Sequence, residues 1–354
     1  MAEVGIPSPT FWNGRKVLVT GHTGFKGKWM LHWLTLMSAK TSGLSYSGYP
    51  NSTLGTRVSP SELELDSDIR SNEWTKDVAA FAPEIIFHFA AQSLLIQGYR
   101  NPEEVTTVNV DGTIKILELF TKIPTLRVII IVTTDKVYKV DSNYAEKVEH
   151  DALGGSDPYS ASKSAVEMIA AGWPLAANQN LATVRSGNVI GGGDFSEMRL
   201  PPDLVRAWET GNSFSPRQPE GVRPWLHVLE TLRGYLLVAE KLYQSSMQKD
   251  SFNFAPTGRD HLCVKDVSEY FASCMGPSEG FRILFDSKSQ LPETRELRLN
   301  ADKAKVQLGW SPIWNCRRSL EQTSKWYRAF YEGFDSDALS TSDLEVYLRE
   351  LRTL

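Results

Sequence analysis

"RKVLVTGHTGFKGKWMLHWLTLM", residues 15 to 37, joins a short apolar strand to a helix through three regularly spaced glycines. The apolar run 17–19 predicts the strand, and the apolar residues between Trp29 and Met37 recur at helical spacing. The turn between them has the spacing G-x-x-G-x-x-G, with glycines at Gly21, Gly24 and Gly27. In this strand–turn–helix context, the pattern predicts a site for the phosphates of a dinucleotide.

Each glycine has a physical task in such a turn. Gly21 permits the tight turn, Gly24 lets a pyrophosphate approach the backbone, and Gly27 lets the helix pack against the strand. The unpaired N–H groups and the positive dipole end of the helix then hold the phosphates. The alternative interpretation is a glycine-rich turn without a ligand, and the surrounding strand and helix favour the dinucleotide.

The chain beyond this segment continues to alternate strands and helices. "EIIFHFAAQ" (84–92) predicts a second buried strand, "NVDGTIKILELF" (109–120) an amphipathic helix, and residues 128–132 a third strand. This order predicts an α/β fold, a Rossmann-type doubly wound parallel sheet with a smaller C-terminal α/β substrate-binding domain. Ligands of such sheets collect beyond the carboxyl ends of the strands.

The composition is that of a globular protein of 354 residues, with 41% hydrophobic and 23% charged residues. A net charge of −4 without a basic block argues against nucleic-acid binding, and no apolar run approaches the ~20 residues of a membrane span. Residues 1–10 have neither the basic nor the apolar region of a secretion signal and predict a short loose tail. Three widely spaced cysteines without a C-x-x-C pair argue against a disulfide framework or a metal site and predict a cytoplasmic protein: Cys263, Cys274 and Cys316.

A second segment, "VTTDKVYKV" (132–140), places ionisable side chains where a buried strand is expected to end. Thr134, Asp135 and Lys136 follow the β-branched run 129–132 and should lie at the carboxyl edge of the sheet. An acid and a base at this edge can serve proton transfer. The plainer alternative is an ion pair at the end of a strand.

Tyr159 and Lys163, in "DPYSASKSAVEMIAA", have the spacing Y-x-x-x-K, which on a helix puts both side chains on one face. An ammonium near a phenol favours the phenolate, so we expect Lys163 to lower the pKa of Tyr159. Such a tyrosine can take a hydroxyl proton while hydride leaves the same carbon for a nicotinamide. The pattern alone is common in surface helices, and its position downstream of a phosphate site favours the catalytic interpretation.

The ribose end of the dinucleotide site is less well marked. About twenty residues after the glycines, where an Asp or Glu usually binds the adenosine ribose of NAD, the chain reads "TSGLSYSGYP". This region also has no Arg for a 2′-phosphate, so the choice between NAD and NADP stays open at this point. Asp68, in "DSDIR", can serve the adenine end instead.

The glycine motif, "HFAAQ", "TTDK" and Y-x-x-x-K, in this order, resemble an extended short-chain dehydrogenase/reductase that acts on a nucleotide sugar. Longer segments resemble the CDP-glucose 4,6-dehydratase group of that family: "FWNGRKVLVTGHTGFKGKW", "SGNVIGGGDF", "RPWLHVLETLRGYLLVAEKLY" and "LGWSPIW". The resemblance covers about residues 11 to 330. It implies an NAD-binding domain over 11–186, to which some later segments return, a mainly nucleotide-sugar-binding domain over 187–335, and a C-terminal helical extension over 336–354.

The resemblance also implies an activity, the NAD-dependent conversion of a nucleotide hexose into its 4-keto-6-deoxy form. Tyr159 would be the base at C4, Lys163 its pKa tuner and ribose ligand, and Thr134 a donor to the C4 oxygen. A dehydratase must also remove the C5 proton and expel the C6 hydroxyl. Asp135 would be the acid toward that hydroxyl, and Lys136 a candidate C5 base or enolate stabiliser.

Binding residues follow from the same resemblance. The implied NAD contacts, besides Tyr159 and Lys163, are Gly21, Thr23, Gly24, Phe25, Gly27, Asp68, Ile69, Ala90, Ala91, Gln92 and Asn109. The implied nucleotide-sugar contacts are Asn188, Arg199, Arg217, Arg223 and Glu293. The helices at 101–122 and 158–172 resemble those that form a four-helix dimer interface in the superfamily, which implies a homodimer.

Some positions depart from the family pattern near the expected hexose. Ser93 and Ile96 stand where the group has a proline and an arginine, "NYAEKVEH" (143–150) lacks an arginine, and "PETRE" (292–296) keeps only Glu293. Two alternatives to the dehydratase therefore stay open. One is another NAD-dependent nucleotide-sugar enzyme, such as a 4-epimerase or a decarboxylase, and the other is a dinucleotide-binding protein without catalysis.

Overall fold

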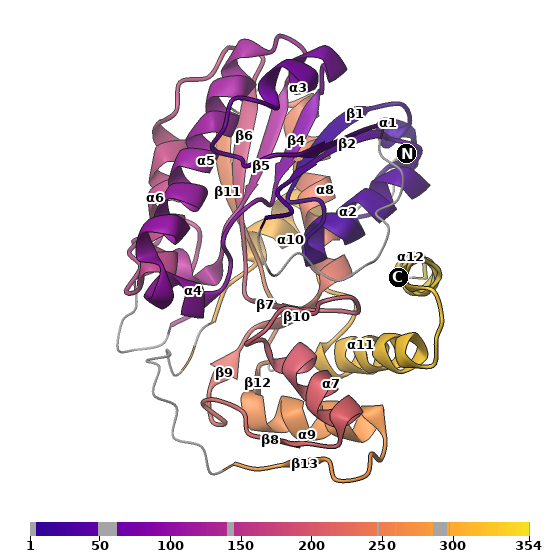
Figure 1. Ribbon diagram of the computed structural model, residues 1–354. Coiled ribbons are helices and arrows are strands. Elements are labelled where there is room, and N and C mark those ends of the chain that lie inside the picture. Colours follow the sequence, from indigo (N-terminus) through magenta and orange to yellow (C-terminus); the bar gives the residue numbers. More distant parts are fainter. Residues whose placement is uncertain are drawn as a thin grey trace.

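The computed structural model describes residues 5–48, 62–139, 145–245, 248–258, 260–285, 296 and 298–353. At its centre lies a seven-stranded sheet in the order β11-β6-β5-β4-β1-β2-β3, and every neighbouring pair is parallel (Figure 1). The strands are β1 (Lys16–Thr20), β2 (Lys40–Ser45), β3 (Leu63–Asp66), β4 (Ile85–His88), β5 (Val128–Val132), β6 (Asn180–Ser186) and β11 (Lys249–Phe254).

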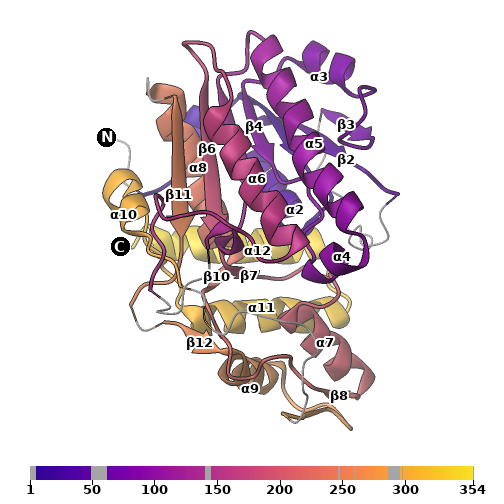
Figure 2. The same cartoon turned by 90° about the vertical axis from the view of Figure 1, so that its left-hand side faces the viewer.

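Helices cover both faces of this sheet (Figure 1, Figure 2). One face is covered by α3 (Thr75–Phe81), α5 (Pro102–Lys122) and α6 (Pro158–Gly172). The other is covered by α2 (Phe25–Leu36) and α8 (Val228–Gln244). The predicted Rossmann-type doubly wound parallel sheet is therefore confirmed.

The two faces have separate hydrophobic cores because strand side chains alternate in direction. In β1, Val17 and Val19 pack with α2 and α8, whereas Leu18 packs with the helices of the opposite face. β5 follows the same rule, and all five of its residues are buried. The β-branched run at 129–132 thus reflects burial on both faces of a central parallel strand.

A second lobe lies beyond the carboxyl ends of the strands (Figure 1). It contains three two-stranded sheets: β7 (Asn188–Ile190) with β10 (Trp225–His227), β9 (Val222–Arg223) with β12 (Leu262–Cys263), and β8 (Ser213–Phe214) with β13 (Arg282–Ile283). Its helices are α7 (Leu200–Thr210), α9 (Val264–Met275) and α11 (Cys316–Tyr331). Between these segments the chain returns to the large sheet through α8, β11 and α10 (Asp302–Leu308).

Both chain ends pack on this framework. The segment predicted as a loose tail is described from Gly5, whose carbonyl accepts a hydrogen bond from Arg233, and Ser8 N–H donates to Glu240 before α1 (Pro9–Trp12). This part of the segment is therefore packed against α8 rather than loose. At the other end, α12 (Ser336–Leu351) attaches to α8 through the hydroxyl of Tyr347, which donates to Glu230.

Several tryptophans contribute to the hydrophobic core. Trp225, Trp310 and Trp326 are buried, and Trp208 packs partly against the same cluster. Within the described residues, no helix has both the length and the apolar character needed to cross a bilayer.

The close packing of the glycine turn predicts that a larger residue at Gly27 destabilises the protein. A Cβ added to Gly27 would lie 2.2 Å from the carbonyl oxygen of Gly21, which is backbone and cannot rotate away. We expect Gly27→Ala to destabilise the protein by about 1–3 kcal/mol, because the first turn of α2 must move off β1. The matched control is Gly172→Ala at the end of α6, where a Cβ meets nothing within 4 Å. That variant should gain up to ~1 kcal/mol of helix propensity. Urea unfolding measures both, and equal effects would contradict the close-approach argument.

Candidate active site

A cavity of about 570 Å³ opens at the carboxyl ends of the central strands, between the sheet and the second lobe. Of the predicted site residues that the structure describes, all except Asn109 line it. Glu293 lies outside the described residues. Residues predicted for cofactor, catalysis and substrate thus come from distant parts of the sequence to one space.

The glycine turn forms one wall of this cavity. Gly21 has φ +70°, and a Cβ there would lie 2.8 Å from the backbone nitrogen of Ala90, at the end of the neighbouring strand. Gly24 is the N-cap residue of α2, and among the described residues no side chain caps that helix. The first backbone N–H groups of α2 are therefore available to an anion. This cradle fits the pyrophosphate of a dinucleotide.

The adenosine side of the cavity is lined by residues at the ends of β2 and β3. Asp68 forms a 2.6 Å ion pair with Arg70, whose hydrogen bond holds the pKa of the carboxyl below its ordinary value. Ser45 occupies the end of β2, where an acidic ribose ligand is usual, and its hydroxyl accepts a 3.2 Å hydrogen bond from the N–H of Thr23. Ser45 thus supports the glycine turn, a role that the sequence analysis missed.

Asn109 does not line the cavity but supports a loop that does. Its side chain accepts from Gln92 N–H at 2.8 Å and donates to the Gln92 carbonyl at 3.1 Å. The same amide donates to the hydroxyl of Ser162 on α6 at 2.9 Å. Asn109 therefore holds the loop after β4 against the helix that carries Tyr159.

A change of backbone conformation places the side chains that follow β5. After Thr134 the chain forms one turn of 3₁₀ helix, η1 (Asp135–Val137), and the Thr134 hydroxyl accepts from the N–H of Lys136 at 3.3 Å. The same hydroxyl donates to Asp135 Oδ1 at 2.9 Å. Thr134, Asp135 and Lys136 all line the cavity as a result.

Helix α6 brings the other two predicted catalytic residues. Asp157 caps the helix by accepting from Ser160 N–H at 2.9 Å, and Pro158 occupies the first turn, where no N–H is needed. Tyr159 and Lys163 then face the end of β5, and Lys163 Nζ donates to the carbonyl of Val132 at 3.1 Å.

Burial controls the protonation of these groups. Asp135 is only 4% exposed, and within the described chain its Oδ2 has no hydrogen-bond partner. Burial raises the pKa of this carboxyl, although Lys136, the Thr134 hydroxyl and Arg223 act in the opposite direction. Burial also lowers the pKa of Lys163 to about 8, against the charge of Glu167. Asp135 is therefore biased toward the protonated form that an acid catalyst needs.

The pKa of Tyr159 differs from the sequence-based expectation. Burial raises the pKa of this phenol to about 12, against the charge of Arg199 and a hydrogen bond with Thr134. The expected lowering of the Tyr159 pKa is therefore wrong in direction for the protein alone, because desolvation of the phenolate outweighs the favourable groups nearby.

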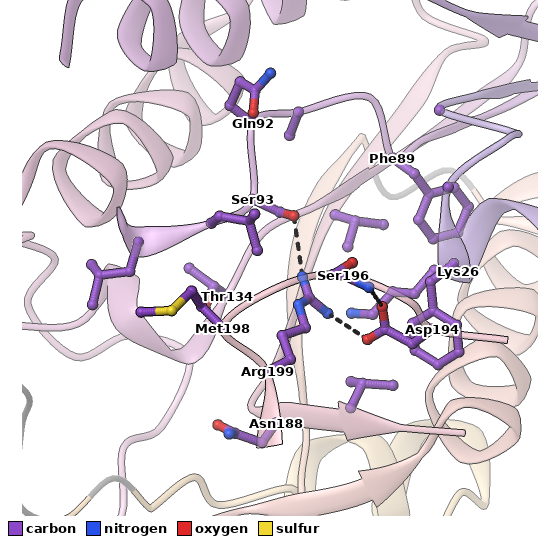
Figure 3. A pocket seen from close by; sticks show the side chains of 18 of the residues that line it. Lys26, Phe89, Gln92, Ser93, Thr134, Asn188, Asp194, Ser196, Met198 and Arg199 are labelled. Atoms are coloured by element: carbon purple, nitrogen blue, oxygen red, sulfur yellow. Dashed lines mark hydrogen bonds and ion pairs between the residues drawn. The ribbon is translucent and has the colours of Figure 1, made fainter. Parts of the chain in front are cut away.

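Arginines line the side of the cavity that faces the second lobe. Arg199 lies between the two halves of the site, donating to Ser93 Oγ at 3.1 Å and pairing with Asp194 at 3.4 Å (Figure 3). Arg217 donates to the Met198 carbonyl at 2.8 Å. Arg223 and Asn188 lie in β9 and β7 and also line the cavity. Ser93, one of the departures from the family pattern, is thus a partner of a predicted substrate ligand.

Lys26 is a cavity residue that the sequence analysis missed. Its Nζ donates to Ser186 Oγ at 3.2 Å, on the side of the cavity where Asp194 lies (Figure 3). Burial lowers the pKa of Lys26 to about 7, and the charges of Arg199 and Lys163 act in the same direction. A cation in the first turn of a helix interacts unfavourably with the helix dipole. The position of Lys26 directly after the glycine turn could therefore have indicated a functional role from the sequence.

Other candidate ligands have structural roles. His227 is buried and caps α8 by accepting from Leu229 N–H at 3.3 Å. The three cysteines are free. In the portion of the chain that the structure covers, no group of three His, Cys, Asp or Glu side chains is arranged to hold a metal ion.

Comparisons with known proteins agree with this geometry. A family model described as "NAD dependent epimerase/dehydratase family" matches residues 17–254. The chain is 36% identical over 352 residues to the CDP-glucose 4,6-dehydratase of Salmonella typhimurium, an alignment that covers 96% of this chain and 97% of the relative.

Solved structures share the fold. The dTDP-glucose 4,6-dehydratase of Bacillus anthracis in complex with NAD is similar with a TM-score of 0.74 at 24% identity, covering 91% of this chain and 99% of that chain. The UDP-glucose 4-epimerase of Thermotoga maritima with UDP-glucose has a TM-score of 0.72 at 21% identity, covering 89% and 99%.

The burial of Asp135 predicts a pH-dependent effect on stability. A carboxyl with a raised pKa stabilises the fold at pH below its ordinary value of 3.8, and this contribution is lost as the pH rises through the raised value. Asp135→Asn should therefore raise the melting temperature at neutral pH and leave it nearly unchanged near pH 3.

The control for this prediction is Asp66→Asn, because hydrogen bonds from Ser47 lower the pKa of the exposed Asp66 carboxyl. Its effect should have the opposite sign at neutral pH. Thermal unfolding across this pH range measures both variants. A destabilised Asp135→Asn protein at neutral pH would contradict the argument.

Proposed function

Because the chain belongs to the NAD-dependent epimerase/dehydratase family, we propose that it is a nucleotide-sugar 4,6-dehydratase that acts on CDP-D-glucose. The reaction oxidises C4 of the hexose, eliminates water across C5 and C6, and returns hydride to C6 to give the 4-keto-6-deoxy sugar. The nucleotide and the hexose follow from the 36% identical relative, whose alignment spans nearly the full length of both chains.

The observation that carries this proposal is the position of Asp135. An enzyme that only removes and returns a hydride needs the tyrosine, the lysine and a hydroxyl donor. Here a further carboxyl is buried in the same cavity, beside Thr134, with one oxygen that has no partner in the described chain. Burying such an oxygen is unfavourable unless a ligand uses it. Loss of the C6 hydroxyl requires an acid at such a position.

The cofactor of the proposed reaction is NAD, and the cradle formed by Gly21, Gly24 and the first turn of α2 fits its pyrophosphate. When bound, NAD supplies the acceptor of the C4 hydride and its donor to C6. We assign this binding to the domain over 11–186 and nucleotide-sugar binding mainly to 187–335. Three free cysteines agree with a cytoplasmic protein.

The residues at the mouth of the sheet have distinct tasks in this proposal. Tyr159 removes the proton of the C4 hydroxyl. The Thr134 hydroxyl, whose single proton is donated to Asp135 in the protein alone, turns to donate a hydrogen bond to the same oxygen. Lys163 is the cation that favours the phenolate, which is needed because burial raises the pKa of Tyr159 to about 12 despite the charge of Arg199 and a hydrogen bond with Thr134.

The elimination step uses the two residues that follow Thr134. A ketone at C4 acidifies the C5 proton, and a protonated Asp135 gives its proton to the departing C6 hydroxyl. Lys136 lines the same cavity and stabilises the enolate that forms when the C5 proton leaves, or removes that proton itself.

The diphosphate of the substrate requires cations on the second-lobe side. Arg199, Arg217 and Arg223 line that side, and a planar guanidinium can bind two phosphate oxygens at once. Asn188 is a further polar group there, and Glu293 remains a predicted sugar contact. Ser93 and Ile96 line the same cavity, and Ser93 accepts a hydrogen bond from Arg199, so these two differences from the family pattern bear directly on the substrate site.

We also infer a homodimer in which α5 and α6 of two copies pair. Met168 projects from α6 with 67% of its surface exposed, which supports an apolar contact on this face. Light scattering should give twice the mass of one chain, and a mass equal to one chain would rule the dimer out.

Isotope tracing tests the proposed reaction. With NAD and CDP-D-glucose that carries deuterium at C4, the product should be the 4-keto-6-deoxy sugar with that deuterium in the C6 methyl group. In deuterated water, a second deuterium should enter at C5, because that proton exchanges with solvent. Mass spectrometry and proton NMR of the sugar locate both labels.

Other outcomes identify the alternatives. Label retained at C4, with the C6 hydroxyl intact and C4 inverted, indicates an epimerase. Lasting accumulation of one reduced cofactor per sugar indicates a different oxidation, and no turnover of any nucleotide sugar despite dinucleotide binding indicates a non-catalytic protein. Asp135→Asn should still oxidise C4 but should not form the methyl group, and full turnover by this variant would remove Asp135 from the mechanism.

A further inference from the structure

Helix α6 carries a third buried polar residue on the face that bears Tyr159 and Lys163. Glu167 follows Lys163 by four residues, so the three side chains succeed one another by one helical turn each. Glu167 is 3% exposed, and no catalytic task follows from the family resemblance. A buried carboxylate next to a catalytic helix face calls for a physical reason.

Four hydrogen bonds fix this carboxylate. Arg185 of β6 donates to Oε1 through Nε and to Oε2 through a terminal nitrogen, both at 2.8 Å. Thr133 donates to Oε1 and Thr183 of β6 donates to Oε2, both at 2.5 Å. Arg185 is 4% exposed, so this is a buried bidentate ion pair with a saturated carboxylate.

One of these bonds reaches the strand end that carries the catalytic turn. Val132, Thr133 and Thr134 are consecutive residues at the end of β5. The carbonyl of Val132 accepts from Lys163 Nζ at 3.1 Å, and the hydroxyl of Thr133 donates to Glu167 at 2.5 Å. Thr134 lies in the cavity beside Asp135. Two hydrogen bonds to adjacent residues therefore attach α6 to the end of β5, next to the site.

We propose that Glu167 is a positioning residue of the active site, which fixes Thr134 relative to Tyr159 through Thr133 and places a negative charge one helical turn from Lys163. This inference rests on the proposed function for the roles of Tyr159, Lys163 and Thr134. Glu167 itself does not touch the reacting atoms. Arg185 holds the carboxylate in place and is its main partner.

The charged groups around Lys163 support the electrostatic part of the proposal. Burial lowers the pKa of Lys163 to about 8, and the charge of Glu167 acts against this shift. Lys26, on α2, interacts with Lys163 as a like charge. His88, on β4, is kept neutral by burial, which lowers its pKa to about 3. Glu167 is thus the group that opposes loss of the ammonium proton.

A matched pair of variants separates positioning from stability. Thr133→Val and Thr183→Val each delete one hydroxyl that donates to Glu167 at 2.5 Å, and the two residues are 5% and 3% exposed. Both should lower the melting temperature by a similar amount. Thr133→Val should lower kcat by roughly 10- to 100-fold with little change in KM, because a small displacement of Thr134 misaligns the reacting groups. Thr183→Val should keep kcat close to wild type.

A second experiment addresses the charge of Lys163 without relying on activity. Competitive acetylation at a series of pH values, followed by mass spectrometry of the Lys163 peptide, gives the pKa of this amine in the nucleotide-free protein. Glu167→Gln should shift that pKa downward, and the alkaline limb of kcat should move to lower pH with it. Because the single variant leaves Arg185 buried without a counter-charge, the double variant Glu167→Gln, Arg185→Gln is made in parallel as the form expected to fold.

Each outcome has a definite meaning. Equal losses of kcat in the two threonine variants, or an unchanged Lys163 pKa in the folded glutamine variants, would overturn the proposal. If the wild-type protein turns over no nucleotide sugar, the proposed function fails, and the labelling result still decides whether Glu167 holds the charge of Lys163. A kcat loss confined to Thr133→Val together with a lowered amine pKa supports the proposal in full.

Discussion

Lys163 and Glu167 fasten helix α6 to two successive residues at the end of strand β5, and the catalytic geometry follows from this attachment. The strand is buried on both faces and cannot shift without opening one of the two cores. The helix is fixed at its start by the Asp157 cap. Tyr159 on the helix and Thr134 after the strand therefore come from two rigid elements, which allows a site to be held to within a fraction of an ångström.

This arrangement concentrates charge where the protein is least hydrated. Asp135 and Lys163 are buried in the cavity wall and Lys26 is partly buried beside them, and burial shifts the pKa of each group in the direction of its neutral form. By contrast, the hydrogen bonds and charge of Glu167 outweigh burial at Arg185 and raise its pKa, since the ion pair has bidentate geometry and further donors. The ionisable groups at the site are thus only partly compensated by the protein, whereas the Glu167–Arg185 ion pair beneath the site is fully hydrogen-bonded. Such a division is expected when the substrate and cofactor, rather than the protein, are to complete the polar contacts.

Much of the fold could be predicted because its signals are local. The glycine spacing, the β-branched run at 129–132 and the i, i+4 relation of Tyr159 and Lys163 each depend on a few neighbouring residues. Features that depend on long-range contacts could not be derived in this way. The packing of residues 5–8 against α8 and the bond between Arg199 and Ser93 join residues that are more than one hundred positions apart. The raised pKa of Tyr159 was missed for the same reason, because spacing reveals a neighbouring cation but not the depth of burial.

In the proposed reaction, the turn after β5 lets one short segment supply groups for both oxidation and elimination. In a continued strand, successive side chains point to opposite faces, so Thr134 and Asp135 would point away from each other. A 3₁₀ turn rotates each residue by roughly 120° relative to the previous one, which lets neighbouring side chains converge on one side. The Thr134 hydroxyl stabilises this turn by accepting from Lys136 N–H, and it also donates to Asp135. In the proposed reaction, the residue assigned to the C4 oxygen therefore also shapes the backbone that presents the proposed acid. The two proposed steps depend on a single side chain, so replacing Thr134 by a residue without a hydroxyl should disturb both the oxidation and the placement of the acid.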